Sequence, residues 1–285
     1  MKKAALVTGC SSGIGLSTAV RLAKEGFQVV ATMRDTNKRD ALLERAKMES
    51  VTLEVAALDV TSEESVQSAI QGVLERYGRI DVLVNNAGAG QFGTMEQVSL
   101  EAAKRTMDVN FFGVWRVTAA VLPTMRAAQS GRIISISSIG GMVGQPFNDA
   151  YCAAKFALEG AMESLAPVLR PHGIWVSLIE PGPVNTEFVQ NVGGRALMGA
   201  TQTDPYFAQM SAYMRNMQAA FANIGQTGND IAATILEAAT ADAPHFRYQT
   251  SALVKTRASG KFADLEGDAQ IAAMADSLLG SASSA

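Results

Sequence analysis

The stretch that most constrains the fold is an apolar run followed by a glycine-rich turn and a helical pattern, within residues 4–25. Ala4 to Thr8 form the short run, which is typical of a strand buried on both faces. Glycines at 9, 13 and 15 follow, and the helical pattern extends from Leu16 to Glu25. Glycines let a backbone approach a pyrophosphate, and the free N–H groups of a helix start bind anions. This stretch therefore predicts a phosphate site of the dinucleotide-binding kind.

The rest of the chain repeats the alternation of short apolar strands with helical stretches. Further strands are expected at 28–33, 52–57, 80–84, 132–136 and 174–179, and helices at 37–48, 61–77, 100–128 and around Tyr151. This order predicts an α/β fold of the Rossmann type, a doubly wound and mainly parallel sheet with helices on both faces.

Four segments follow the carboxyl ends of predicted strands. They are Gly9–Gly15, Asn85–Gly88, Ser138 and Pro181–Thr186. Ligands of doubly wound sheets bind outside the carboxyl ends of the strands. We therefore expect these segments to meet at one edge of the sheet and to form one site.

The second predicted strand ends in Met33-Arg34-Asp35, where the choice between NAD and NADP is usually made. An acidic side chain here suits the ribose 2′-hydroxyl of NAD, whereas an arginine suits the 2′-phosphate of NADP. Arg34 and Asp35 compete for this position, and Arg34 could also be a solvated loop charge. Because Arg34 comes first, the pattern favours NADP, with NAD as the alternative.

Tyr151 and Lys155 lie four residues apart in a helical context, so their side chains share one helix face. A phenol has a pKa of about 10, and a nearby cation favours its ionised form. A tyrosine whose pKa is lowered in this way can act as a general acid or base near neutral pH. The alternative is a surface pair with no chemical role.

These motifs, in this order, resemble the classical short-chain dehydrogenases/reductases. The matching residues are Thr8, Gly9, Gly13, Gly15, Asn85, Asn86, Ala87, Gly88, Asn110, Ser138, Tyr151, Lys155, Pro181 and Gly182. The likeness spans about residues 4–186 and is closest to the branch of 17β-hydroxysteroid dehydrogenase type 1 and retinol dehydrogenase. It implies an oxidoreductase that transfers a hydride between NADP, or NAD, and an apolar ketone or secondary alcohol, steroid-like or other. A retinal-like or other apolar aldehyde is the alternative substrate, and a nucleotide-sensing protein without turnover is the third reading.

The resemblance also implies residue roles. Tyr151 would be the acid/base, and Lys155 would lower the pKa of Tyr151 and hold the nicotinamide ribose. Ser138 would hydrogen-bond the substrate oxygen, and Asn110 would position a water that continues the proton relay. The cofactor-binding positions that the resemblance implies are Gly9, Ser11, Ser12, Gly13, Ile14, Gly15, Arg34, Asp59, Val60, Asn86, Ala87, Gly88, Tyr151, Lys155, Pro181, Gly182, Val184 and Thr186.

Composition restricts the partners. The net charge is -3, and the basic residues are scattered, which argues against nucleic acid. No run approaches the eighteen or so apolar residues of a membrane span. The two cysteines do not suggest a disulfide framework, so we expect a reducing, cytoplasmic location. The two histidines lie far apart, and no metal site is expected. The resemblance implies a homodimer or homotetramer.

A single domain of 285 residues is expected, with two less regular parts near its end. Residues 187–225 carry Met and aromatic side chains at helical spacing, which predicts either a substrate lid or a helix packed on the core. A helix at 227–240 and an edge strand at 245–249 follow. The tail from about 261 to 285 has only a weak helical pattern, and its end is expected to fray.

Overall fold

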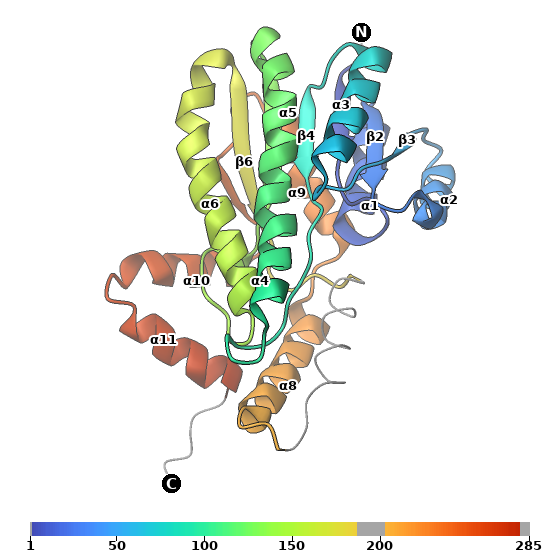
Figure 1. Ribbon diagram of the computed structural model, residues 1–285. Helices are drawn as coiled ribbons and strands as arrows, with labels where there is room; N and C mark the ends of the chain where they lie inside the picture. The colour runs from blue at the N-terminus through green and yellow to red at the C-terminus, as the bar shows by residue number, and fades with distance from the viewer. Residues whose placement is uncertain (1, 187–202, 280–285) are drawn as a thin grey trace.

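The computed structural model describes residues 2–186 and 203–279 (Figure 1). Its centre is a seven-stranded sheet in the order β3-β2-β1-β4-β5-β6-β7, and every neighbouring pair of strands is parallel. The strands are β1 Ala4–Val7, β2 Gln28–Met33, β3 Glu54–Ala57, β4 Val82–Asn85, β5 Gly131–Ile136, β6 Ile174–Glu180 and β7 Arg247–Gln249. The predicted doubly wound sheet of the Rossmann type is confirmed, and the expected edge strand near 245–249 is β7.

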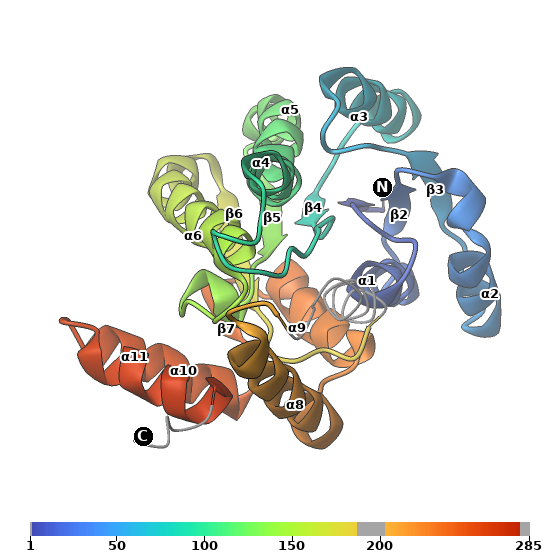
Figure 2. The same ribbon diagram turned by 60° about the horizontal axis from the view of Figure 1, so that its bottom comes forward.

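Helices cover both faces of this sheet. They are α1 Gly13–Lys24, α2 Asp40–Met48, α3 Glu63–Tyr77, α4 Leu100–Met107, α5 Gly113–Ala127, α6 Asp149–Leu169, α8 Phe207–Ile224, α9 Gly228–Thr240, α10 Ala252–Ala263 and α11 Asp268–Met274. Figure 2 shows α3, α5 and α6 on one side of the sheet and α1 and α9 on the other. Neighbouring strand residues point to opposite faces. In β1, Val7 packs into the core on the α1 and α9 side, and Leu6 packs into the core on the α3, α5 and α6 side.

Local sequence signals fix where several helices begin and end. The hydroxyl of Ser62 caps α3 by accepting a hydrogen bond from the backbone N–H of Ser65 at 3.2 Å. The same helix ends at Gly78, whose φ of 70° is a left-handed conformation that glycine adopts without strain. Thr227 and Asp230 form a capping box at the start of α9. These caps fix where α3 begins and ends and where α9 begins, one helix on each face of the sheet.

The long helix expected over 100–128 is interrupted. A π-helical turn, Asp108–Phe112, separates α4 from α5. A π-turn inserts one residue into the helical repeat, and such turns are frequent at functional sites. Its only buried side chain, among the five residues, is Asn110. None of the helices in the described part of the chain has the length and apolar character that crossing a membrane requires.

A third apolar cluster lies apart from the two sheet layers, and Figure 1 shows α8, α10 and α11 gathered there beyond the strand ends. We call it the apolar wall. Its buried members are Ile139, Met142, Val143, Phe147, Met210, Tyr213, Val254, Ala258, Met274 and Leu278. Residues 187–202, the first part of the predicted lid, lie outside the described residues. The remainder of the predicted lid is α8, which packs on this wall rather than on the sheet.

The weak helical pattern of the tail corresponds to helices up to residue 279. Residues 252–279 form α10, α11 and a final π-turn, and Met274 and Leu278 are buried against α8. Asn216 Nδ2 of α8 donates to the carbonyl oxygen of Leu278 at 3.0 Å. The weak sequence period reflects a segment that buries only a few large side chains. Residues 280–285 lie outside the described chain.

Candidate active site

The glycine turn after β1 packs against the segment after β4 so closely that side chains are excluded. A Cβ added to Gly15 would lie 2.3 Å from the carbonyl oxygen of Gly9 and 2.4 Å from Asn86 Nδ2. A Cβ on Gly9 would lie 2.8 Å from the Cα of Ala87. Asn86 fastens the two segments, because its Nδ2 donates to the carbonyl oxygens of Thr8 and Gly9, both at 2.9 Å.

The start of α1 is suited to an anion. Gly13, with a φ of +59°, begins the helix, and no acidic residue lies in its first turn. The N-cap residue, Ser12, makes no capping hydrogen bond with its side chain. The first N–H groups of a helix lack partners within the helix and carry partial positive charge. Ser11, Ser12 and Ile14 are all partly exposed at this turn. The turn can therefore receive a phosphate group.

The segment 181–186 after β6 reaches the glycine turn. A Cβ on Gly13 would lie 3.2 Å from Thr186 Cγ2, so the two segments are in contact. Val184 is buried and pairs in a parallel bridge with Gln226, which precedes α9. The carbonyl oxygen of Pro181 accepts a hydrogen bond from the N–H of Ile139 at 2.8 Å. The predicted convergence of this segment with Gly9–Gly15 and the residues after β5 is observed.

Arg34 and Asp35 at the end of β2 have different environments. Asp35 accepts a hydrogen bond from the N–H of Asn37 at 3.0 Å and thereby caps the short 3-10 turn Thr36–Lys38. Arg34 is exposed, and it has no ion pair within residues 2–186 and 203–279. Of the two competing side chains, the arginine is the one that local structure leaves available for a ligand.

Asp59 and Val60 follow β3 and border the same edge. Asp59 Oδ1 accepts from the N–H and the hydroxyl of Thr61, at 2.9 and 2.7 Å. Val60 is buried, and a Cβ added to Gly113 at the start of α5 would lie 2.8 Å from its Cγ2. These two residues are therefore held rigidly beside the π-turn.

Asn110 ties the π-turn to the segment after β4. It is fully buried, and its Nδ2 donates to the carbonyl oxygens of Ala89 and Thr106 at 2.7 and 2.9 Å. Its Oδ1 accepts from the N–H of Ala89 at 3.2 Å. A Cβ on Gly88 would lie 3.0 Å from the same oxygen. Of the two possibilities for an asparagine within a helix, solvent exposure or buried partners, the structure shows buried partners.

Ser138 and Tyr151 meet beside Gly140. A Cβ on that glycine would lie 3.3 Å from the Tyr151 ring and 3.5 Å from Ser138 Oγ. Burial raises the pKa of Tyr151 to about 12, although its hydrogen bond with Ser138 acts to lower it. This direction is opposite to the lowering expected from Lys155. Tyr151 is therefore protonated at neutral pH in this structure.

Lys155 is buried and lies one helical turn after Tyr151. Its Nζ donates to the carbonyl oxygen of Ile136 at 2.7 Å and lies 5.8 Å from the centroid of the tyrosine ring. Burial lowers the pKa of Lys155 to about 8, while the carboxylate of Glu159 acts to raise it. The lysine is thus mostly protonated at neutral pH and loses its charge not far above it.

Both cysteines flank the site but are not reactive thiols. Cys10 and Cys152 are free and buried. Burial raises the pKa of Cys10 to about 12 and that of Cys152 to about 11. Because the thiolate is the nucleophilic form, both side chains act here as small packing groups.

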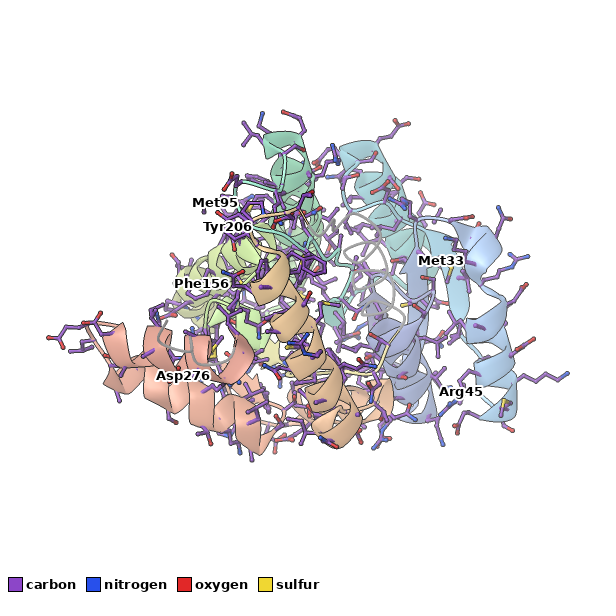
Figure 3. All side chains as sticks on the ribbon, turned by 90° about the horizontal axis from the view of Figure 1, so that it is seen from below. Met33, Arg45, Met95, Phe156, Tyr206 and Asp276 are labelled. Carbon is purple, nitrogen blue, oxygen red and sulfur yellow. The ribbon has the colours of Figure 1, made fainter. Side chains whose placement is uncertain are left out.

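The apolar wall adjoins Ser138 and Tyr151. Phe92, Phe147 and Tyr213 form an aromatic trio whose ring centroids are 5.5 to 5.8 Å apart. Asn148, which precedes α6, donates to the hydroxyl of Tyr213 at 2.8 Å. Figure 3 shows Tyr206 beside Met95, and its hydroxyl donates to Glu96 at 2.7 Å. The wall also includes Ile139, which directly follows Ser138 in the chain.

The sequence reading missed one set of residues close to Lys155. The buried Glu159 and Glu180 form a charged group with the partly buried Arg247. A charged residue at position 159 on the buried face of an otherwise apolar helix is the signal that could have shown part of it. The role of Arg247 depends on β7 pairing with β6, which the chain order alone does not reveal.

Comparisons with known proteins agree with this geometry. A sequence model of the family described as "short chain dehydrogenase" matches residues 3–196. Human retinol dehydrogenase 8 is 44% identical over 256 residues, covering 86% of this chain and 80% of that protein. Human 17-beta-hydroxysteroid dehydrogenase type 1 is 43% identical over 253 residues, covering 86% of this chain and 76% of that protein.

Solved structures show the same fold. A short-chain dehydrogenase from Streptomyces avermitilis has a TM-score of 0.80 and 31% identity, covering 95% of this chain and 96% of that one. A variant of actinorhodin polyketide ketoreductase with NADPH has a TM-score of 0.72 and 30% identity, covering 87% and 96%. The family model, the two human relatives and the solved structures all agree with the parallel sheet. The chain therefore belongs to the short-chain dehydrogenase family of oxidoreductases, which act on CH–OH groups.

Proposed function

We propose that the protein is an NADP-dependent oxidoreductase that reduces an apolar ketone, steroid-like or other, to a secondary alcohol. The observation that carries the proposal is the pairing of a protonated Tyr151 and a buried Lys155 with an apolar wall beside them. NAD is the alternative cofactor. The relatives act, by their names, on retinol and on hydroxysteroids, which supports an apolar substrate for this chain as well.

The residues present fit a dinucleotide. Gly9 and Gly15 lack side chains and pack closely, so a pyrophosphate can approach the backbone of the turn. The start of α1 has no acidic residue, which also suits a pyrophosphate. Arg34 suits a 2′-phosphate, which an arginine can bind through two parallel N–H groups. NADPH accompanies one of the similar solved structures, which supports the same choice here.

The other predicted positions border this site from successive strand ends. Asp59, Val60, Asn86, Ala87 and Gly88 are proposed to line the adenine side and the central part of the cofactor. Pro181, Gly182, Val184 and Thr186 are proposed to hold the nicotinamide end, since Thr186 already contacts the glycine turn. Ser11, Ser12 and Ile14 complete the phosphate contacts.

The chain's own groups handle the proton and the substrate oxygen. A bound nicotinamide supplies the hydride. Tyr151 donates its proton to the carbonyl oxygen, and Ser138 donates a hydrogen bond that stabilises the charge developing there. Lys155 favours the ionised tyrosine that remains, and Asn110 supports the path by which the proton is replaced. A protonated Tyr151 is in the form that a general acid requires in reduction, and the reverse reaction would need its ionised form.

A retinal-like or other apolar aldehyde is the second candidate substrate. The similarity to retinol dehydrogenase 8, 44% against 43% for the hydroxysteroid enzyme, supports it equally well. The apolar wall offers aromatic and methionine side chains that suit either ligand. A protein that only senses the nucleotide is disfavoured because Ser138, Tyr151, Lys155 and Asn110 are all present.

A homodimer or homotetramer is proposed as the assembly. Phe112, Trp115 and Phe156 have exposed fractions of 47%, 57% and 39%, and the first two lie within a short stretch of the π-turn and α5. Exposed aromatic side chains on neighbouring helices are typical of interfaces. A cytoplasmic location is also proposed, on the two unpaired cysteines.

The first experiment is a fluorescence-monitored titration with NADPH and with NADH, on the unmodified protein and on Arg34→Ala. We expect tighter binding of NADPH, and we expect the preference to be lost in the variant. Equal or tighter binding of NADH, unaffected by the substitution, would contradict the NADP assignment.

The second experiment compares Tyr151→Phe with the unmodified protein, using an apolar ketone and a retinal-like aldehyde as substrates. Loss of the general acid should lower the rate about 100- to 10,000-fold without weakening NADPH binding. An unchanged rate would contradict the mechanism. The ratio of the two substrates' kcat/KM distinguishes ketone from aldehyde reduction.

A further inference from the structure

A group of charged side chains lies close to Lys155, where α6 meets the strands β6 and β7. It consists of Glu159 and Glu163 on α6, Glu180 at the end of β6, and Arg247 at the start of β7, and we call it the carboxylate cluster. Glu159 is 6% exposed and Glu180 is completely buried. Among the described residues, no group of three or more His, Cys, Asp or Glu side chains could hold a metal ion, and this cluster is no exception.

One arginine serves three carboxylates in this cluster. Arg247 Nε lies 3.2 Å from Glu159 Oε2 and 3.2 Å from Glu180 Oε1, and its Nη2 lies 2.7 Å from Glu163 Oε2. Nε donates a hydrogen bond to Glu159 Oε2 and Nη2 donates one to Glu163 Oε2, whereas Glu180 Oε1 accepts no hydrogen bond. Glu180 Oε2 instead accepts from Gln249 Nε2 at 2.5 Å. The two buried carboxylates therefore converge on a single N–H group.

Burying these charged side chains costs free energy, so the cluster is a poor source of folding stability. Two buried carboxylates next to one guanidinium leave a charge without full compensation, and burial of such charges costs several kcal/mol per ion. Burial and, as a smaller cause, the charge of Glu159 together raise the pKa of Glu180 to about 7. Buried ion clusters are often no more stabilising than apolar residues of equal volume. Net stabilisation is therefore not an adequate account of the cluster.

The cluster is connected to the candidate catalytic residues at three places. Glu159 lies one helical turn after Lys155, and its charge raises the lysine pKa. Across Gly141, Glu159 approaches Ser137, which precedes Ser138: a Cβ on this glycine would lie 2.5 Å from Ser137 Oγ and 3.2 Å from Glu159 Cγ. Glu180 directly precedes Pro181, whose carbonyl oxygen holds Ile139.

We propose that Glu159 is a positioning residue for the reaction: its buried carboxylate, held by Arg247 between Ser137 and Glu180, keeps Lys155 protonated so that the lysine can support Tyr151. The inference rests on the proposed function of Lys155 and Tyr151. Glu159 does not touch the substrate. It acts through the charge of the lysine and through the alignment of α6 with the end of β5. Burial raises the pKa of Glu159, and the contact with Arg247 acts against this rise, while Glu180, which accepts a hydrogen bond from Gln249, contacts the same Nε.

The test uses Glu159→Gln, with Glu163→Gln as a matched control. Both variants remove one carboxylate of α6 that contacts Arg247, but the Glu163 side chain is 64% exposed, so solvent screens its charge. The alkaline limb of kcat/KM for NADPH-dependent ketone reduction should move down by about 1 pH unit in Glu159→Gln. In Glu163→Gln it should move by less than about 0.3 unit.

A second readout does not require turnover. The lysine pKa is followed directly by NMR of protein carrying ¹³C-labelled lysine, with Lys155→Met to assign the signal. The same downward shift is expected in Glu159→Gln. Equal shifts in both variants, or none in either, would overturn the proposal. If no ketone is reduced but the NMR shift is present, the proposed function fails while the electrostatic link stands. Thermal melting of each variant shows whether it is folded.

Discussion

At the scale of single residues, Asn110 shows how a side chain that is unfavourable within a helix becomes structural. Its amide makes two hydrogen bonds that join the π-turn to the backbone of Ala89, and a third to the carbonyl oxygen of Thr106. Buried backbone groups are costly when they lose their partners. The π-turn and the segment after β4 are therefore fixed together by one side chain.

Replacing Asn110 with Ala should be strongly destabilising. The N–H and C=O of Ala89 and the carbonyl of Thr106 would lose their bonds to this side chain, so we expect the free energy of unfolding to fall by about 2 to 4 kcal/mol. Binding of NADPH should weaken as well, because the segment 86–89 loses its anchor. Urea unfolding and nucleotide titration measure the two effects. A variant with unchanged stability would contradict the structural role of the amide.

Most residues of the candidate site could be proposed from the sequence because they belong to short local motifs. Gly9, Gly13, Gly15, Ser138, Tyr151 and Lys155 lie where strand ends and one helix face place them. The pKa of Tyr151 was predicted in the wrong direction, because it depends on burial by segments far away in the chain. Glu159 and Arg247 were missed for the same reason, since 88 positions separate the two partners.

At the scale of elements, the glycine turn and α1 act as one unit with the segment after β4. Gly15 lies inside the first turn of a helix, where an alanine is normally favourable. The close approach of the Gly9 carbonyl oxygen and Asn86 removes that advantage. The glycine is thus required by packing between elements rather than by its own backbone conformation.

Gly15→Ala should abolish NADPH binding, because the new methyl group would displace Gly9 or Asn86 from the phosphate site. Gly72→Ala is the matched control: Gly72 lies within α3, and an added Cβ would meet no atom within 4 Å. The control should bind NADPH normally and gain about 0.5 to 1 kcal/mol in stability. Nucleotide titration and thermal melting distinguish the two, and unimpaired binding by Gly15→Ala would disprove the packing argument.

Element boundaries were predicted well where caps and glycines are strong, as at Ser62, Gly78 and Thr227. They were predicted poorly where tertiary contacts decide. The interruption of the helix at 108–112 has no local breaker, and α10 and α11 carry few apolar residues in a regular period. Both features depend on partners, Ala89 in one case and α8 in the other.

At the scale of the whole molecule, the apolar wall joins segments from the middle and the end of the chain. Phe92 and Phe147 come from loops before α4 and α6, Tyr213 from α8, and Leu278 from the last π-turn. The nucleotide site lies mostly in the first half of the chain. The proposed substrate and cofactor contacts thus come from different parts of the chain.

A chain truncated after Asp264 should lose substrate affinity selectively. The truncation removes Met274 and Leu278, which are buried against α8. We expect KM for an apolar ketone to rise about 10-fold or more, as the loss of two buried apolar side chains weakens the packing of α8. The NADPH dissociation constant should change little. Equal loss of both affinities would show instead that the truncation unfolds the protein.

The stability of the molecule should depend on pH through Glu180. Its pKa is raised from 4.5 to about 7 on folding, so the folded protein holds a proton that the unfolded chain releases over this range. Stability from this group is present below about pH 4.5 and is lost as pH rises to about 7, by at most about 3 kcal/mol.

Glu180→Gln should remove this decline. The free energy of unfolding of the variant, measured by urea titration from pH 5 to pH 8, should fall less with rising pH than that of the unmodified protein. Parallel pH dependences in the two proteins would mean that Glu180 is already ionised at low pH in the folded state.

The packing of α1 against α9 has a consequence for how the chain is made. Ala19, Val20 and Leu22 of α1 share a core with Ile231, Ile235 and Ala238 of α9, and Gly228 lies against Gly13. The apolar face of α1 is therefore fully covered only by residues that lie more than 200 positions later in the chain. During synthesis the apolar face of α1 stays partly exposed until α9 has been translated. We expect chaperones that bind nascent chains to bind the uncovered apolar face of α1.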